Sequence, residues 1–153
     1  MGRFRKTINE IRSKSFPEIK GKILLIIIPF PIPGGSVHWP LPRLKLLALT
    51  TKCRKLDDMV LRGIIAHELS HLSAFEKWGY KKFWKFYRKA TKKEVIKHEK
   101  DTDKLTIKKG YGKEVIATKK KAKELLEGTR WEKYLDNYLT EEEVKKYIKK
   151  LEK

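Results

Sequence analysis

Five consecutive residues carry the clearest chemical signal in the chain: His67-Glu68-Leu69-Ser70-His71, an H-E-x-x-H pattern. On an α-helix, residues four apart lie on one face, so His67 and His71 can offer two imidazole nitrogens to one metal ion. Glu68 lies on the adjacent edge, where its carboxylate can act as a general base toward a water on the metal. The pattern therefore predicts a Zn2+ site and a metal-dependent hydrolase, with peptides as the expected substrate.

The sequence around the motif favours a helix. Apolar residues recur at three- to four-residue spacing between Leu56 and Phe75, as on an amphipathic helix. Asp57 and Asp58 suit the N-terminus of this helix, and Gly79 suits its end. The alternative interpretation is an ordinary core or surface helix whose two histidines bind no metal.

A catalytic zinc site needs a third protein ligand, which a later helix can supply. The metzincin pattern would place Gly at position 74 and His at position 77, but this chain has Ala74 and Lys77, so that class is excluded. Glu99 and Asp103 are four residues apart and share a face of the helix predicted over Lys93–Lys109. We expect Glu99 to be the third ligand and Asp103 to accept a hydrogen bond from a ligand imidazole, which would orient the ring.

Other side chains compete for these roles. His98 and Asp103 are alternative third ligands, and Glu94, one turn earlier, is a weaker one. A solvated helix face with ordinary i,i+4 ion pairs would also explain the charges of this segment. Peptide hydrolysis needs a further donor to the developing oxyanion, and the candidates are Tyr111, His98 and His38.

Length and cysteine content limit the class of protein. A chain of 153 residues is one domain by size, large enough for a core without cross-links. Cys53 is the single cysteine, which excludes an intrachain disulfide and a cysteine-based zinc cluster and indicates a reducing, cytoplasmic compartment. The strongest apolar run, Ile23 to Ile28, is far shorter than the ~20 residues of a transmembrane helix.

The predicted elements run strands first and helices after, which predicts an α+β fold: a small N-terminal sheet packed on the active-site helix, then a mostly helical C-terminal half. The expected strands are a buried strand over Ile23–Phe30, a short edge strand over Val37–Trp39 and an ambiguous one over Leu44–Thr50. Besides the two helices already named, we expect a short amphipathic helix carrying Phe4, Ile8 and Ile11. Further helices are expected over Tyr80–Ala90, Glu114–Glu127, Trp131–Tyr138 and Thr140–Lys150, the last opened by a capping box. The single domain would comprise a basic N-terminal arm (1–21), a catalytic core (22–112) and C-terminal helices (113–153).

The charge of the chain is strongly positive, because 38 Lys and Arg oppose 19 Asp and Glu, for a net charge of +19. The excess is concentrated between Lys77 and Lys97, where nine cations accompany one acid and six aromatic residues are interleaved. Basic residues with stacking aromatics are typical of single-strand binding and suggest nucleic acid as a partner. The alternative is a solvated lysine-rich surface of the kind found in thermophile proteins, with the rings in the core.

Three patterns together resemble one family: the H-E-x-x-H motif at 67–71, Glu99-x-x-x-Asp103, and Gly110-Tyr-Gly112. They resemble the gluzincin metallopeptidases, and the small size is similar to the minigluzincins, compact archaeal members of that clan. The resemblance spans residues 56–112 and does not extend into the terminal thirds.

The resemblance implies a role for each matched residue: zinc ligands His67, His71 and Glu99, general base and acid Glu68, and supporting carboxylate Asp103. It also implies that the protein is latent, as some minigluzincins are zymogens whose terminal segments block the cleft. By this analogy, the segment 1–21 or the helices after Gly128 would cover the site.

Three functions remain as hypotheses. The first is a zinc peptidase whose substrate extends along a strand edge, supplied by Leu44–Thr50 or Val37–Trp39. The second is a DNA- or RNA-associated protease in the manner of SprT-like enzymes, motivated by the basic run 77–97. The third is a non-enzymatic basic binding protein, and the sequence does not indicate an oligomeric state.

Overall fold

The computed structural model describes residues 2–41 and 43–153. A three-stranded sheet near the N-terminus precedes a mostly helical half, which confirms the predicted α+β class. The helices and strands, in chain order, are α1 (Gly2–Ser15), β1 (Lys22–Ile28), β2 (Gly35–Leu41), β3 (Leu44–Thr50), α2 (Asp58–Trp78), α3 (Tyr80–Lys89), α4 (Lys92–Thr106), α5 (Gly112–Leu126) and α6 (Glu141–Leu151). Short 3-10 segments occupy Thr51–Lys55 and Glu132–Asn137, and a π-helical turn occupies Ile107–Tyr111.

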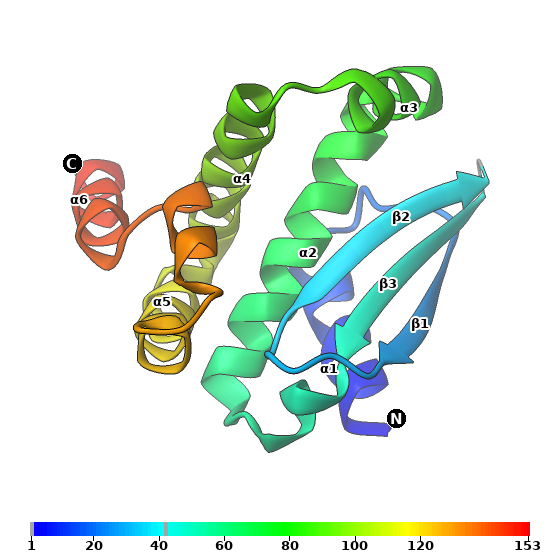
Figure 1. Ribbon diagram of the computed structural model, residues 1–153. Coiled ribbons are helices and arrows are strands. Elements are labelled where there is room, and N and C mark those ends of the chain that lie inside the picture. The colour runs from blue at the N-terminus through cyan, green and yellow to red at the C-terminus, as the bar shows by residue number, and fades with distance from the viewer. Residues whose placement is uncertain (1, 42) are drawn as a thin grey trace.

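Helix α2 runs through the middle of the molecule, with the sheet on one side and α4 and α5 on the other (Figure 1). The Asp57 side chain accepts the Val60 N–H and so caps the first turn, and Gly79, with φ of 79°, ends the last. The predictions that Asp57 and Asp58 mark the N-terminus of this helix and that Gly79 marks its end are therefore confirmed. Because α2 is covered on several sides, it can carry a buried polar site among apolar residues.

The strand order in the sheet is β1-β3-β2, with β1 parallel and β2 antiparallel to β3. Strand β3 pairs on both sides, so the prediction that Leu44–Thr50 could offer a free edge to a substrate is wrong. Strand β2 lies at an edge, as predicted for Val37–Trp39, and is longer than expected. Strand β1 is the opposite edge, and only Leu25 of it is fully buried, so the prediction of a buried strand there is also wrong.

Helix α1 belongs to the core. Its apolar residues Phe4, Ile8 and Ile11 are buried in the same cluster as α2 and the sheet. The Arg3 guanidinium donates to Asp58 Oδ1 at 2.6 and 3.1 Å, which fastens α1 to the first turn of α2. Within residues 2–21, the basic segment expected as an arm is thus mainly a packed helix.

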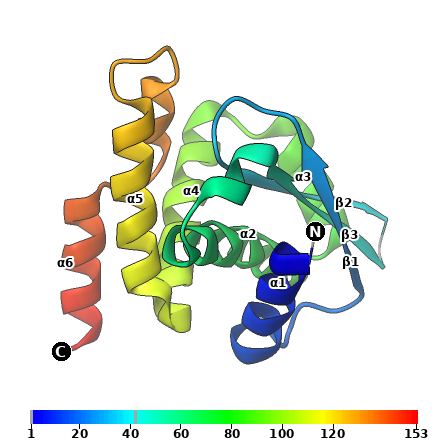
Figure 2. The same cartoon turned by 90° about the horizontal axis from the view of Figure 1, so that it is seen from below.

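The helical half continues from α2 through α3 and α4 to α5 and α6 (Figure 2). Thr91 and Glu94 form a capping box at the start of α4, and Thr140 and Glu143 form the predicted one at the start of α6. The expected helix over Trp131–Tyr138 is a 3-10 segment. A second apolar cluster joins α5 and α6, and no helix in the described part of the chain is long and apolar enough to cross a membrane.

Candidate metal centre

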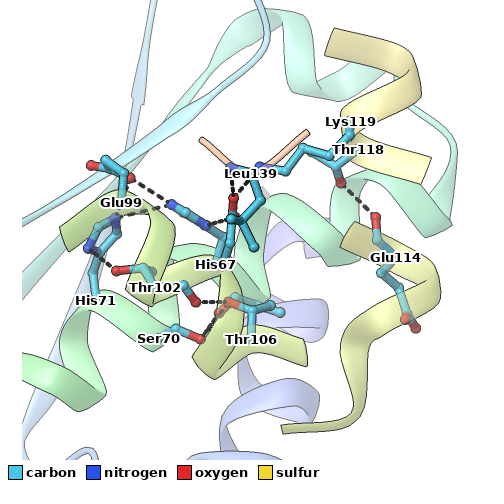
Figure 3. Close-up of polar contacts among 12 residues, drawn as sticks. His67, Ser70, His71, Glu99, Thr102, Thr106, Glu114, Thr118, Lys119 and Leu139 are labelled. Carbon is cyan, nitrogen blue, oxygen red and sulfur yellow. Dashed lines mark hydrogen bonds and ion pairs between the residues drawn. The ribbon is translucent and has the colours of Figure 1, made fainter. Parts of the chain in front are cut away.

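The centre lies where α2 and α4 face one another. His67 and His71 project from successive turns of α2, and Glu99 projects toward them from α4 (Figure 3). The Nε2 atoms of His67 and His71 are 3.1 Å apart, and Glu99 Oε2 lies 3.1 Å from the first and 3.2 Å from the second. The structure thus brings together the three side chains that the sequence predicted as ligands.

The donor set fits a metal ion. Bonds of about 2.0–2.1 Å at tetrahedral angles, usual for nitrogen and oxygen ligands, place ligand atoms about 3.3 Å apart. The three observed separations are close to this value and nearly equal to one another. His67, His71 and Glu99 could therefore hold one cation with little rearrangement.

His67 is oriented from behind by Asp103. His67 Nδ1 lies 2.9 Å from Asp103 Oδ1, so this nitrogen carries the proton and Nε2 is left for the metal. The other oxygen of Asp103 accepts the backbone N–H of Leu139 at 3.0 Å and pairs with the Lys119 ammonium at 2.7 Å (Figure 3). Asp103 is almost fully buried, and it connects the centre to α5 and to the segment before α6.

His71 is oriented by a different pair. Its Nδ1 lies 2.8 Å from His98 Nε2 and 3.2 Å from Thr102 Oγ1, both from α4. Burial and the neighbouring His71 side chain lower the pKa of His98 to about 4, so His98 is neutral and its Nε2 can accept the His71 Nδ1 proton. His98, predicted as a rival ligand or an oxyanion donor, contacts His71 Nδ1 and is not among the three side chains whose donor atoms converge.

Local electrostatics favour a charged cluster. Burial would lower the pKa of His67, but hydrogen bonds to Asp103 and Glu99 raise it to about 10. Burial would raise the pKa of Glu99, but the two imidazoles outweigh it and hold that pKa far below its usual value. A cation at the centre would replace the proton on His67, so metal binding and proton release are coupled.

Glu68 lies beside the ligands and faces the start of β2. It is 6% exposed, and burial raises its pKa although His71 and His67 pull in the opposite direction. Gly35 packs directly on its side chain: a Cβ built at position 35 would stand 2.7 Å from Glu68 Cγ. The edge strand therefore passes directly over this carboxylate.

A cavity of about 750 Å³ opens at Glu68 and His67. Its walls are mostly apolar and come from the loop after β1, the start of α2, the end of α5 and the 3-10 segment before α6. Phe30 and Trp131 meet edge to face at 5.5 Å and so join two of these walls. None of the described residues in 2–21 lines the cavity, whereas several residues after Gly128 do, so of the two terminal segments only the C-terminal one borders the site.

Three predicted side chains lie elsewhere. Tyr111 is buried in the core, where its hydroxyl bonds Ser15 and its ring stacks with Phe16, so the prediction that it serves the site is wrong. His38 packs against the ring of Tyr87 and does not line the cavity. Glu94 caps α4 and is not a ligand.

Tyr138 is the residue that sequence reasoning missed. Its ring lies 5.7 Å from that of His67, with Lys119 4.6 Å from the ring centre, and it lines the cavity together with Glu68. Burial and the neighbouring carboxylates raise its pKa, so the hydroxyl remains protonated. Tyr138 is 71 residues from His67 in sequence, and no local pattern connects the two.

Comparison of the chain with protein-family models, with curated proteins and with solved structures found no match.

Proposed function

We propose that this chain is a zinc-dependent peptidase whose ligands are His67, His71 and Glu99. The observation that carries the proposal is the near-equilateral triangle of ligand atoms with the buried carboxylate of Glu68 beside it. Two imidazoles and one carboxylate form a donor set that catalytic zinc sites use. A bound zinc ion would lower the pKa of a coordinated water to about 7 and polarise a carbonyl group.

Glu68 is the proposed general base. Its raised pKa makes it a better proton acceptor at neutral pH than an ordinary glutamate. It would take the proton of the attacking water and then deliver a proton to the departing amine, as the same group can act as base and then as acid. The backbone of β2 at Gly35 holds it in place by direct contact.

The substrate in this proposal is an extended peptide. Strand β2 is an open edge and passes over Glu68, so a peptide that pairs with β2 would present its backbone to the site. The apolar walls of the adjoining cavity would receive a large apolar side chain next to the cleaved bond. A peptide substrate that binds through its backbone does not need one fixed sequence.

Tyr138 is the proposed donor to the oxyanion. A tyrosine that stays protonated beside His67 can give a hydrogen bond to an oxygen that gains negative charge, which stabilises the transition state. Tyr138→Phe removes only the hydroxyl, and kcat should fall by about 10²–10³ while KM changes little. Unchanged kcat in that variant would remove Tyr138 from the mechanism.

The decisive experiment compares Glu68→Gln with Glu94→Gln. Both change one carboxylate to an amide, but Glu94 is exposed at the first turn of α4 and is not part of the ligand group. Zinc content by elemental analysis should be one per chain in both, while hydrolysis of a quenched fluorescent peptide library should fall by at least about 10² in Glu68→Gln alone. Peptide cleavage that survives Glu68→Gln would refute the proposal.

The third ligand has its own test. Glu99→Ala should lose zinc during dialysis that leaves the metal on the parent protein, because two imidazoles alone hold zinc weakly. Asp101→Ala, an exposed acid on the same helix, is the matched control. Full zinc retention by Glu99→Ala would show that another group completes the coordination.

A further inference from the structure

The helix that follows α2 carries an exceptional charge pattern. Within residues 77–93 every charged side chain is a cation, and all eight are exposed: Lys77, Lys81, Lys82, Lys85, Arg88, Lys89, Lys92 and Lys93. None of them lies within ion-pair distance of an acid in the part of the chain that the structure describes. We call these eight residues, with Tyr80, Trp84 and Tyr87, the α3 surface.

Aromatic rings accompany the charges on this surface. Phe83 is buried and anchors α3, and Tyr87 stacks on it at 5.9 Å while remaining 57% exposed. The rings of Trp84 and Tyr87 meet at 5.5 Å. A shallow hollow of about 510 Å³ lies among Tyr80, Lys81, Trp84, Lys85, Arg88 and Lys89. Charged heads and ring surfaces therefore line the same concavity.

We propose that the α3 surface binds single-stranded nucleic acid. Phosphates would neutralise cations that have no acidic partner among the described residues, and release of the phosphates' counterions would drive association. Lys81, Lys85 and Lys89 stand at successive helical turns, about 6 Å apart along the axis, so one phosphate chain can follow them. Unpaired bases can stack on Tyr87 and Trp84, and stacking of this kind is largely independent of sequence.

The packing of α3 argues against an anionic membrane as the partner. A helix that lies in a membrane interface inserts an apolar face, with Trp, Phe or Leu, below the headgroups. In α3 that face is already used, because Phe83 is buried and Phe86 packs against Trp78 and His98. In duplex nucleic acid the base faces are stacked inside the helix. A duplex would therefore contact the lysine and arginine side chains of the α3 surface but would not stack on its aromatic rings.

The α3 surface is separate from the candidate metal centre. Helix α3 lies beyond the C-terminal end of α2, away from the loop after β1 (Figure 1). None of its residues lines the cavity at Glu68. The inference therefore stands whether or not the chain is a peptidase, and metal can be omitted from its test.

The test measures fluorescence anisotropy of a labelled 20-mer of deoxythymidine with the full chain in EDTA, over a series of NaCl concentrations. The variant Lys81→Glu/Lys85→Glu/Lys89→Glu is compared with Lys146→Glu/Lys149→Glu/Lys150→Glu, whose lysines are exposed on α6. Both triple variants lower the net charge equally, so a difference in their affinities reports the α3 surface and not the total charge of the protein. Circular dichroism confirms that each variant is folded.

We expect the parent protein to bind with a steep salt dependence, about −0.7 in log–log slope for each phosphate contact. The α3 triple should bind about tenfold or more weakly with a slope reduced by about 2, whereas the α6 triple should bind almost as the parent does. Tyr87→Ala, which leaves the charges in place, should weaken binding about tenfold without changing the slope.

Several results would overturn the inference. These are no binding at 50 mM NaCl, equal losses in the two triples, tighter binding to a 20-base-pair duplex than to the single strand, or unchanged affinity in Tyr87→Ala. Association with vesicles containing anionic phosphatidylglycerol, in the absence of oligonucleotide binding, would assign the surface to a membrane instead.

Discussion

Glycine at position 35 has no side chain, and this lets β2 approach Glu68 closely. A Cβ at Gly35 would lie 2.7 Å from Glu68 Cγ and 3.0 Å from its Cδ, so Gly35→Ala must displace the carboxylate. A shift of about 1 Å in a catalytic group can cost 10²-fold in rate, and we expect kcat to fall by about 10- to 10²-fold with zinc retained. Gly34→Ala is the matched control, since a Cβ there meets nothing within 4 Å. Equal kinetics in the two variants would contradict this account of Glu68.

Asp103 connects the candidate metal centre to two other segments of the chain. It accepts hydrogen bonds from His67 and from the backbone N–H of Leu139, and it forms an ion pair with Lys119. Asp103→Asn should weaken zinc affinity by about 10- to 100-fold, because the ligand imidazole loses its carboxylate partner. Competition with a chromophoric chelator measures the affinity, and Asp101→Asn, exposed on the same helix, should behave as the parent protein. An unchanged affinity in Asp103→Asn would mean that His67 is held by its packing alone.

At the scale of elements, the close approach of α2 and α5 depends on Gly63. A Cβ at this position would stand 2.1 Å from Thr118 Oγ1 and 2.5 Å from the backbone oxygen of Glu114, whose positions Figure 3 shows. Backbone cannot swing aside as a side chain can, so Gly63→Ala must push α5 away from α2. We expect a loss of about 1–3 kcal/mol in the free energy of unfolding, despite the better helix propensity of alanine.

Gly112, a second helical glycine, provides a comparison for Gly63. A Cβ at Gly112 would meet the tip of the Ile148 side chain, which can rotate away. Gly112→Ala should therefore cost less than Gly63→Ala in urea unfolding. The opposite order would show that the α2–α5 contact is more adaptable than the structure indicates.

The whole molecule is tied together by a few ion pairs between distant segments. Glu18, in the link between α1 and β1, accepts from Ser73 of α2 and from Lys109 of the π-helical turn. Burial would raise the pKa of Glu18, but these two hydrogen bonds outweigh it and lower the pKa below 4.5. A carboxyl group with a lowered folded-state pKa contributes stability above its unfolded value and loses that contribution as the pH falls through the folded value.

Glu18→Gln should therefore be less stable than the parent protein at pH 7, and the difference should shrink as the pH falls below about 4.5. Urea unfolding at a series of pH values measures both chains. Glu127→Gln, an exposed carboxylate with no ion pair among the described residues, should show little difference from the parent at pH 7. A constant gap between parent and Glu18→Gln from pH 7 to pH 3 would mean that the lost contact is packing and not charge.

Local patterns sufficed for several features of this protein. Helical spacing put His67 and His71 on one face, and the capping box at Thr140 marked where the last helix begins. The order of strands and helices predicted the α+β class correctly. The helical spacing and the capping box depend on residues within one or two turns of each other, and the fold class depends on the order of the elements along the chain, so the sequence is sufficient for both.

Contacts between elements required the tertiary structure. Glu99 was the expected third ligand, but only the packing of α4 on α2 decides that it, and neither of its rivals His98 and Asp103, meets both Nε2 atoms. Packing also decides that β3 is the central strand, that Tyr138 lines the site and that Tyr111 is buried in the core. Each helix carries several polar residues, and its own periodicity cannot say which of them will face which neighbour. That choice is made when the apolar faces of all the elements are buried together, because only then is the partner across each gap defined.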